Sequence, residues 1–330
     1  MRINSITKTT QVANKQQHLK HNSIDHSVIY NDNSPLKRTT NVTFQASSAE
    51  IERLLARKGI TCDFAGNSFV AECVNRTVNL FENLFGKSSL PSEVNYRYIG
   101  SPDVEGIAQY WATYNRVDIN SADSCFNNKS SLQNAMIKHK RVIGMPAWLS
   151  TSHYLHPIVH EFGHGAHFNN IESRGNDYTW SWMTDKIPNA VGKLITKFKL
   201  SSYANYNLKE FMAERISKDV CKNLNYNDCY IGDKKDIDYS NIFSRKWNCR
   251  YSTPQAYLDY YTQQIWNGDM SGAEDAEGKI EEFLTEIERP RFSSTHKRGG
   301  FWGAVDEIAS TLTGEAKWLD NLNKAKKRKY

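Results

Sequence analysis

The feature that most constrains this chain is a run of five residues, His160-Glu161-Phe162-Gly163-His164, which has the form His-Glu-x-x-His. In a helix, residues four apart lie one turn apart on the same face. Two imidazoles so placed can bind one zinc ion through ring nitrogens at about 2.0–2.1 Å. Glu161 then lies beside the metal, where its carboxylate can take a proton from a zinc-bound water. The spacing therefore predicts a zinc hydrolase, most simply a peptidase, and it requires a third ligand elsewhere.

Further histidines stand in the same segment, at positions 153, 156 and 167. His156 and His160 are also four residues apart, so they form a second possible pair. Only His160 and His164 enclose a glutamate next to the first histidine, and we prefer that pair. The alternative is a helix whose histidines only cap and pack, because short motifs of this kind also arise by chance.

The expected helix covers residues 152–168. Pro157 is compatible with its first turn, where the missing N–H would have no helical partner in any case. Gly163 and Gly165 lie inside this helix, and such small residues allow another element or a substrate to approach closely. The segment therefore has the character of a helix built for close contact.

The third ligand decides the class of zinc site. The extended metzincin pattern needs glycine at 167 and histidine at 170, but the chain has His167 and Asn170, so that class is excluded. A carboxylate further along the chain is the alternative. Glu210 and Glu214 are one turn apart on a predicted helix over residues 207–223. One carboxylate could bind zinc while the other orients a ligating histidine, and the sequence leaves open which does which.

Glu210 also has a competing structural explanation. Asn207 and Glu210 have the spacing of a capping box, in which the glutamate would bond back to the start of its own helix. A two-histidine motif requires a third ligand, which favours Glu210 as a zinc ligand. Other acidic residues serve as fallback ligands, namely Asp177, Asp185 and Asp219.

These segments together resemble a known family. His160-Glu161-Phe162-Gly163-His164, followed by Tyr203 and by Glu210-Phe211-Met212-Ala213-Glu214, is similar to the catalytic domain of anthrax lethal factor and its relatives, which are gluzincin-type zinc endopeptidases. Met212 stands where that family has phenylalanine, a substitution that roughly conserves volume. The resemblance covers about residues 155–215.

The resemblance implies a zincin-like fold and a single Zn²⁺ held by His160, His164 and Glu210. It implies that Glu161 is the general base and that Tyr203 assists the transition state. The substrate would be a protein. A tyrosine at a helix entrance is also a common packing residue, so Tyr203 has a purely structural alternative.

The chain is expected to divide at about residue 45. Residues 1–45 are rich in polar residues and lack a sustained apolar period, which predicts a disordered leader. Such leaders resemble, in composition, the uncleaved export signals of bacterial type III secreted effectors; an ordinary disordered tail is the alternative. Residues 46–330 are expected to form a metallopeptidase domain with a helical C-terminal extension.

Periodicity within residues 46–330 predicts an α+β fold, with a small mixed sheet before the motif helix and mostly helices after it. Strand patterns occur at 94–99 and within 109–120, and a polar loop is expected at 121–131. Apart from the motif helix, helices are expected at 47–59, 68–85, 185–200, 207–223, 254–266, 273–287 and 301–322. Ser47 and Glu50 have the spacing of a capping box at the start of the first, and the second carries a mainly apolar stripe that Gly86 is expected to end.

Composition limits the partners. No apolar run reaches the roughly 18–20 residues of a membrane span, and no apolar segment follows Arg2 as a cleaved signal peptide would require. Six scattered cysteines without a C-x-x-C pair suit a reducing compartment. The net charge of +6 is too small to argue nucleic-acid binding. The basic run at 324–329 reads as a solvated helix end or, alternatively, a nuclear-localisation or acidic-partner patch.

The leading hypothesis is a zinc endopeptidase that a bacterium delivers into the host cytoplasm, without a cleaved signal peptide, to cut a specific host protein. A housekeeping or interbacterial zinc peptidase is one alternative. A binding module with a vestigial motif is another, and it predicts that no stoichiometric zinc is bound. No sequence signal indicates an oligomeric state.

Overall fold

The computed structural model describes residues 46–101, 106–140, 147–175, 186–198, 200–240 and 253–288. Several predictions made above lie outside these residues. They concern the leader at 1–45, the helix at 301–322, the basic run at 324–329, and the fallback ligands Asp177 and Asp185.

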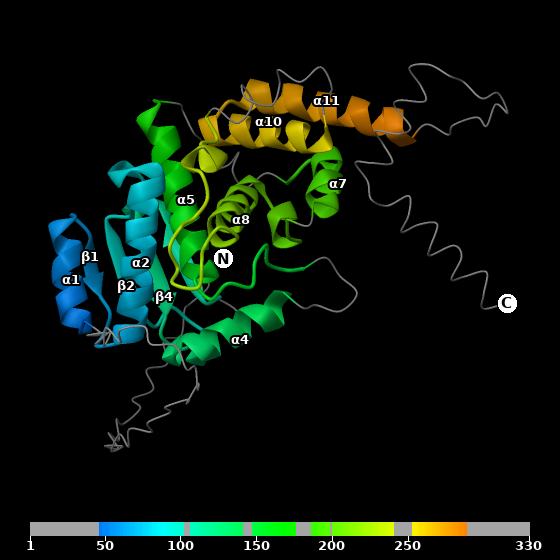
Figure 1. The fold of residues 1–330 in the computed structure, drawn as a ribbon. Coiled ribbons are helices and arrows are strands. Elements are labelled where there is room, and N and C mark those ends of the chain that lie inside the picture. The colour runs from blue at the N-terminus through cyan, green and yellow to red at the C-terminus, as the bar shows by residue number, and fades with distance from the viewer. Residues whose placement is uncertain are drawn as a thin grey trace, which may run out of the picture. The chain divides into compact units, whose positions relative to one another are not determined.

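The described residues form a helix-rich α+β structure, which confirms the predicted class (Figure 1). Its α-helices are α1 Ser48–Arg57, α2 Ser68–Phe85, α4 Lys129–Lys140, α5 His156–Ser173, α7 Asn189–Lys197, α8 Leu208–Cys221, α10 Pro254–Asn267 and α11 Met270–Glu288. Its strands are β1 Thr61–Asp63, β2 Glu93–Arg97, β3 Ala108–Trp111 and β4 Arg116–Asn120. Short 3₁₀ turns include η2 Ala112–Tyr114, η3 Ser124–Asn127 and η4 Tyr203–Asn205. Among these described helices, none is both long and apolar enough to cross a membrane.

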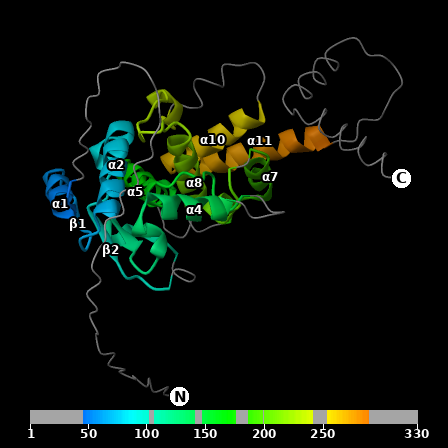
Figure 2. The same cartoon turned by 60° about the horizontal axis from the view of Figure 1, so that its bottom comes forward.

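The four strands form one mixed sheet in the order β1-β2-β4-β3. β1, β2 and β4 run parallel, whereas β3 pairs antiparallel with β4, with Tyr110 opposite Val117. β3 is therefore an edge strand of the described sheet. α5 packs on β3 and β4, α1 packs on β1, and α2 lies between α1 and α5 (Figure 2). The motif helix is thus placed directly against the edge strand.

Strong local signals predicted the first two helices well. Ser47 and Glu50 form the capping box expected at the start of α1. α2 covers the predicted residues 68–85, its apolar stripe is buried, and Gly86 ends it at a φ of +89°, which favours glycine.

Other boundaries were predicted wrongly. The motif helix begins at His156 rather than at residue 152 and continues to Ser173, because Pro157 occupies its first turn and the residues before it form a turn. The strand segments expected within 109–120 are confirmed as β3 and β4, which are separated by η2 and by Asn115 at a φ of +45°. α4 and β1 were not predicted; α4 buries only Leu132 and Met136, so its apolar period is weak.

Close packing of α5 on α8 depends on Gly163. A Cβ at this position would lie 3.3 Å from Ala213 Cα and 3.5 Å from Ala213 O, both backbone atoms of α8. No rotamer change can move those atoms, so a side chain here must push the two helices apart. The small residue expected to allow close approach does so against α8.

We expect Gly163→Val to lower the free energy of unfolding by about 1–3 kcal/mol, the usual cost of overpacking. Urea denaturation followed by circular dichroism measures this. The matched control is Gly278→Val, since Gly278 is an exposed helical glycine in α11 whose added Cβ would meet nothing within 4 Å. Equal effects of the two substitutions would show that α5 and α8 are not in the close contact described.

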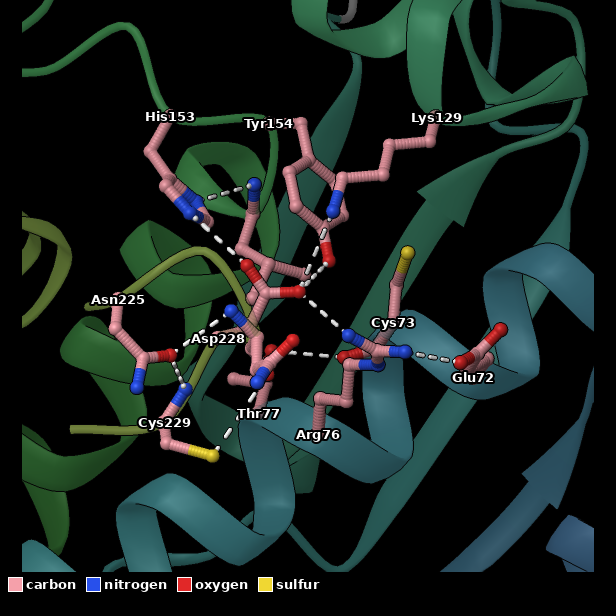
Figure 3. A network of polar contacts seen from close by, with 12 residues as sticks. Glu72, Cys73, Arg76, Thr77, Lys129, His153, Tyr154, Asn225, Asp228 and Cys229 are labelled. Carbon is pink, nitrogen blue, oxygen red and sulfur yellow. Dashed lines mark hydrogen bonds and ion pairs between the residues drawn. The ribbon is translucent and has the colours of Figure 1, made fainter. Parts of the chain in front are cut away.

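A buried aspartate, Asp228, binds the segment that leads into the motif helix α5. Asp228, in the turn after α8, accepts hydrogen bonds from Arg76 of α2 and from Tyr154, just before α5 (Figure 3). His153 Nε2 lies 3.2 Å from the same carboxylate and Lys129 Nζ of α4 lies 3.5 Å from it. Asp228 therefore ties α2, α4 and the segment leading into α5 to the turn that follows α8.

These contacts lower the pKa of Asp228 and so make its contribution to stability depend on pH. Burial alone would raise the pKa of Asp228, but hydrogen bonds from His153 and Tyr154 and the charge of Lys129 lower it from 3.8 to about 2. A lowered carboxyl pKa contributes stability that is fully present above the unfolded value and is lost as pH falls towards the folded one. The difference between the two pKa values corresponds to about 2 kcal/mol.

We therefore expect Asp228→Asn to destabilise the protein by about 2 kcal/mol at pH 6, and this difference from wild type to shrink between pH 4 and pH 2. Asparagine is the matched replacement because Asp228 has a φ of +61°, which asparagine tolerates. Urea denaturation across this pH range measures the effect. A difference that stays constant with pH would contradict the assigned role.

Candidate metal centre

α5 and α8 bring two histidines and one glutamate together in the interior. His160 Nε2 lies 3.0 Å from Glu210 Oε2 and 3.1 Å from His164 Nε2, and His164 Nε2 lies 3.3 Å from Glu210 Oε2. All three side chains are about nine-tenths buried or more. The predicted ligand set is therefore a compact triangle of two nitrogens and one oxygen.

The size of this triangle fits one zinc ion. Zinc bonds of about 2.0–2.1 Å in a tetrahedron place neighbouring ligand atoms about 3.3–3.4 Å apart. The observed separations of 3.0, 3.1 and 3.3 Å are close to that edge length. Two imidazoles and one carboxylate are also the donor types found in catalytic zinc sites. The residues present thus fit the metal in both spacing and chemistry.

The carboxylate charge in the triangle also favours a bound cation. A carboxylate accepts hydrogen bonds but donates none when ionised, so two imidazole nitrogens can face it closely only with a proton or a metal ion between them. Burial would raise the pKa of Glu210, but His164 and His160 hold it well below its usual range. Burial likewise opposes the charged form of His160, whereas Glu210 and Glu214 raise its pKa.

Glu214 lies on the other side of His160. Its Oε1 is 3.0 Å from His160 Nδ1 and 3.1 Å from His156 Nε2, and its Oε2 accepts a hydrogen bond from the Ser150 backbone N–H at 2.7 Å. A proton on His160 Nδ1 that is donated to Glu214 leaves Nε2 to act as the ligand atom. The arrangement gives Glu210 and Glu214 different positions, with Glu210 at the triangle and Glu214 behind one of its histidines.

His156, His160 and Glu214 form a second group that could hold a metal. That group would have to use His160 Nδ1, because Nε2 faces Glu210. Glu214 is already surrounded by two imidazole nitrogens and one backbone N–H, so its carboxylate has donors on both oxygens. In the triangle, Glu210 Oε2 faces His160 and His164, while Lys209 Nζ lies 3.9 Å from the other oxygen, Oε1. Because the triangle contains the histidine pair that encloses Glu161, it is the stronger candidate.

The helix cap suspected at Glu210 is formed by the side chain of Asn207 and the backbone N–H of Glu210. Asn207 caps α8 by accepting a hydrogen bond from the Glu210 backbone N–H at 2.9 Å. The Glu210 carboxylate itself lies against His160 and His164. The backbone of Glu210 therefore takes part in the cap while its side chain is directed to the histidines.

Glu161 lies beside the triangle and at the edge of a cavity. It is half-buried, and one carboxylate oxygen lies within 4.8 Å of ligand atoms of His160 and His164. It also lines a cavity of about 400 Å³, together with His160, Tyr203 and the residues that lead into edge strand β3 at Ala108. A ligand in this cavity would contact both Glu161 and His160, one corner of the triangle.

Tyr203, in η4, packs face to face with His160. Their ring centroids are 5.6 Å apart at 25°, and Trp148 stacks on Tyr203 at 5.2 Å. Burial, followed by the charges of Glu210 and Glu161, raises the pKa of Tyr203, so its hydroxyl keeps its proton near neutral pH. A protonated hydroxyl beside these carboxylates can act as a hydrogen-bond donor in the cavity.

The remaining candidates lie away from the triangle. His167 Nε2 is 2.8 Å from Ile265 O, and burial lowers the pKa of His167 to about 4, which keeps the ring neutral. His153 contacts Asp228. Asp219, the fallback ligand that the structure describes, is bound to Arg215. The contacts of these three side chains are therefore with residues outside the triangle.

Sequence reasoning missed several contributors. Ser150 and Trp148 belong to a segment with no recognisable pattern, and their contacts to Glu214 and Tyr203 are made across more than fifty residues of sequence. The ring of Tyr110 in β3 stacks on His164, with the ring centroids 6.4 Å apart. A Cβ on Gly165 would lie 3.2 Å from the Tyr110 ring. Gly165 was the one available signal for this contact, since it indicated a close approach without naming the partner.

Comparison with known proteins adds no relative. No protein-family model, curated protein or solved structure matches the chain.

Proposed function

We propose that this protein is a zinc-dependent endopeptidase with a zincin-like domain. The observation that carries the proposal is the triangle of His160 Nε2, His164 Nε2 and Glu210 Oε2, with separations of 3.0–3.3 Å. His160, His164 and Glu210 would hold one zinc ion. When bound, zinc supplies a Lewis acid that makes water nucleophilic near neutral pH and polarises a peptide carbonyl.

The protein's own residues take the other roles. Glu161 accepts the proton released when water attacks the peptide bond and delivers it to the leaving amine. The Tyr203 hydroxyl donates a hydrogen bond to the carbonyl oxygen as negative charge develops there. Glu214 keeps His160 in the tautomer and orientation that a ligand requires. All four side chains are supplied by α5, α8 and η4, which pack against one another.

Edge strand β3 supports a peptide as the substrate. β3 has β4 on one side and no strand on the other within the described sheet. Gly106, Ile107 and Ala108, at its start, line the same cavity as Glu161 and His160. An extended peptide can add to such an edge through main-chain hydrogen bonds, which would lay its backbone across the cavity. This favours an endopeptidase acting on an extended segment of a protein.

Delivery into a host cell is proposed on the composition of residues 1–45 alone. The test is to fuse these residues to a reporter in a bacterium that has a type III apparatus. Export that depends on the apparatus supports a secreted effector acting on a host protein, and retention in the bacterium leaves a peptidase that acts elsewhere.

The activity itself is tested by searching for new protein termini in host-cell lysate incubated with wild type and with Glu161→Gln. We expect a small set of new termini that needs zinc and is lost in the variant. New termini that are the same for both proteins would count against the proposed chemistry. Absence of zinc from the purified wild-type protein would favour a binding module with a vestigial motif.

A further inference from the structure

The side chain of His156 is buried, and its polar contact among the described residues is with Glu214. Its exposed fraction is 2%, and its Nε2 lies 3.1 Å from Glu214 Oε1. Its Nδ1 is buried and has no hydrogen-bond partner in the part of the chain that the structure describes. A buried polar atom without a partner costs free energy, so an apolar residue of similar size would stabilise this position better. Within the described residues, the contact with Glu214 is therefore the polar side-chain contact that favours a histidine here.

Glu214 connects that contact to the metal centre and to the cavity wall. Oε1 is shared between His156 and His160, and Oε2 accepts the Ser150 N–H at 2.7 Å. Ser150 follows Trp148, which stacks on Tyr203 and lines the cavity. The Tyr203 N–H in turn donates to Trp148 O at 3.3 Å. One carboxylate thus joins a candidate zinc ligand to the segment that forms one side of the cavity.

We propose that His156 is a positioning residue that acts through Glu214. By donating to Oε1, His156 holds the carboxylate in the one orientation that serves both His160 Nδ1 and the Ser150 N–H. The metal centre and the cavity wall at residues 147–150 are then a single unit, in which loosening Glu214 disturbs both. This inference rests on the proposed zinc site, and it assigns to His156 neither a ligand role nor a place among the reacting groups.

The test compares His156→Leu with His156→Gln. Glutamine can place an N–H where His156 Nε2 lies but is a poor zinc ligand, whereas leucine removes the donor. The control is His167→Leu, which removes another buried histidine of α5 without touching Glu214. Two quantities are measured: the zinc dissociation constant, by competition with a chelating dye, and hydrogen–deuterium exchange of the peptide containing Ser150.

We expect His156→Leu to weaken zinc binding about 10–100-fold, the usual effect of losing a group that orients a ligand, and to speed exchange at Ser150. His156→Gln should restore both to within about threefold of wild type, given that its N–H replaces the lost donor. His167→Leu should lower stability without either change. If His156→Leu does not fold, His156→Asn, whose amide is too short to reach Glu214, takes its place.

Three results would overturn the inference. Unchanged zinc binding and exchange in His156→Leu would show that Glu214 needs no support. Loss of zinc in His156→Gln as severe as in Glu210→Ala would make His156 a ligand. If His167→Leu changed zinc binding and exchange as much as His156→Leu does, both changes would be explained by general destabilisation of the protein. The exchange measurement is also made on metal-free protein. A wild type that binds no zinc would contradict the proposed function. Exchange at Ser150 in the metal-free protein would still show whether His156 holds the Glu214 carboxylate in place.

Discussion

Replacing Glu161 by glutamine should leave zinc bound and lower kcat/KM by about 10²–10⁴-fold, the range that a lost general base produces. Glutamine has nearly the same shape as glutamate, so the cavity and the metal triangle should be retained. It cannot accept the proton of an attacking water or return it to the leaving amine. Rates on a substrate found in host lysate, together with zinc content, measure the effect.

The matched control for this substitution is Glu172→Gln, an exposed glutamate on the same helix. It removes the same charge from α5 far from the triangle, and kcat/KM should stay within about threefold of wild type, as for most surface substitutions. A Glu161→Gln enzyme with wild-type turnover would mean that Glu161 is not the base. Loss of zinc from this variant would mean that it is a ligand.

Replacing Glu210 by alanine should weaken zinc binding by roughly 10²–10³-fold, because about 10–16 kcal/mol of zinc binding is shared among a few ligands. Replacing Glu214 by alanine should weaken it only about 10–100-fold, since that residue orients His160 without touching the metal. Both glutamates are buried on α8, one turn apart, so each variant serves as the control for the other. Zinc dissociation constants measured by dye competition give the comparison.

The order of the two effects is the informative result. A larger loss in Glu214→Ala than in Glu210→Ala would exchange the two roles and move the metal towards His156. That outcome would also contradict the tautomer assigned to His160, whose Nδ1 faces Glu214 and whose Nε2 faces Glu210.

Local signals account for what could be predicted of this fold. The long apolar period of α2 and the capping box of α1 lie within single helices, and both were found. The pair His160 and His164 is likewise local, because four residues of helix place both rings on one face. α4 was missed since it buries too little apolar surface to leave a period. Features encoded within a single helix were therefore predictable.

Features that depend on packing between distant segments were only partly predictable. Both glutamates were found as candidates, but their different positions around His160 follow from the packing of α8 against α5, which no local pattern encodes. Ser150 contributes a backbone N–H, for which side-chain identity carries no signal. His156 was visible as a second possible pair with His160; its contact with Glu214 spans 58 positions and required the structure.

The most direct test of the zinc site is a crystal of the purified protein, with X-ray data collected at the zinc absorption edge. We predict one anomalous peak per chain, about 2.0–2.1 Å from His160 Nε2, His164 Nε2 and a Glu210 oxygen. A peak between His156, His160 Nδ1 and Glu214, or no peak in zinc-supplemented crystals, would contradict the account.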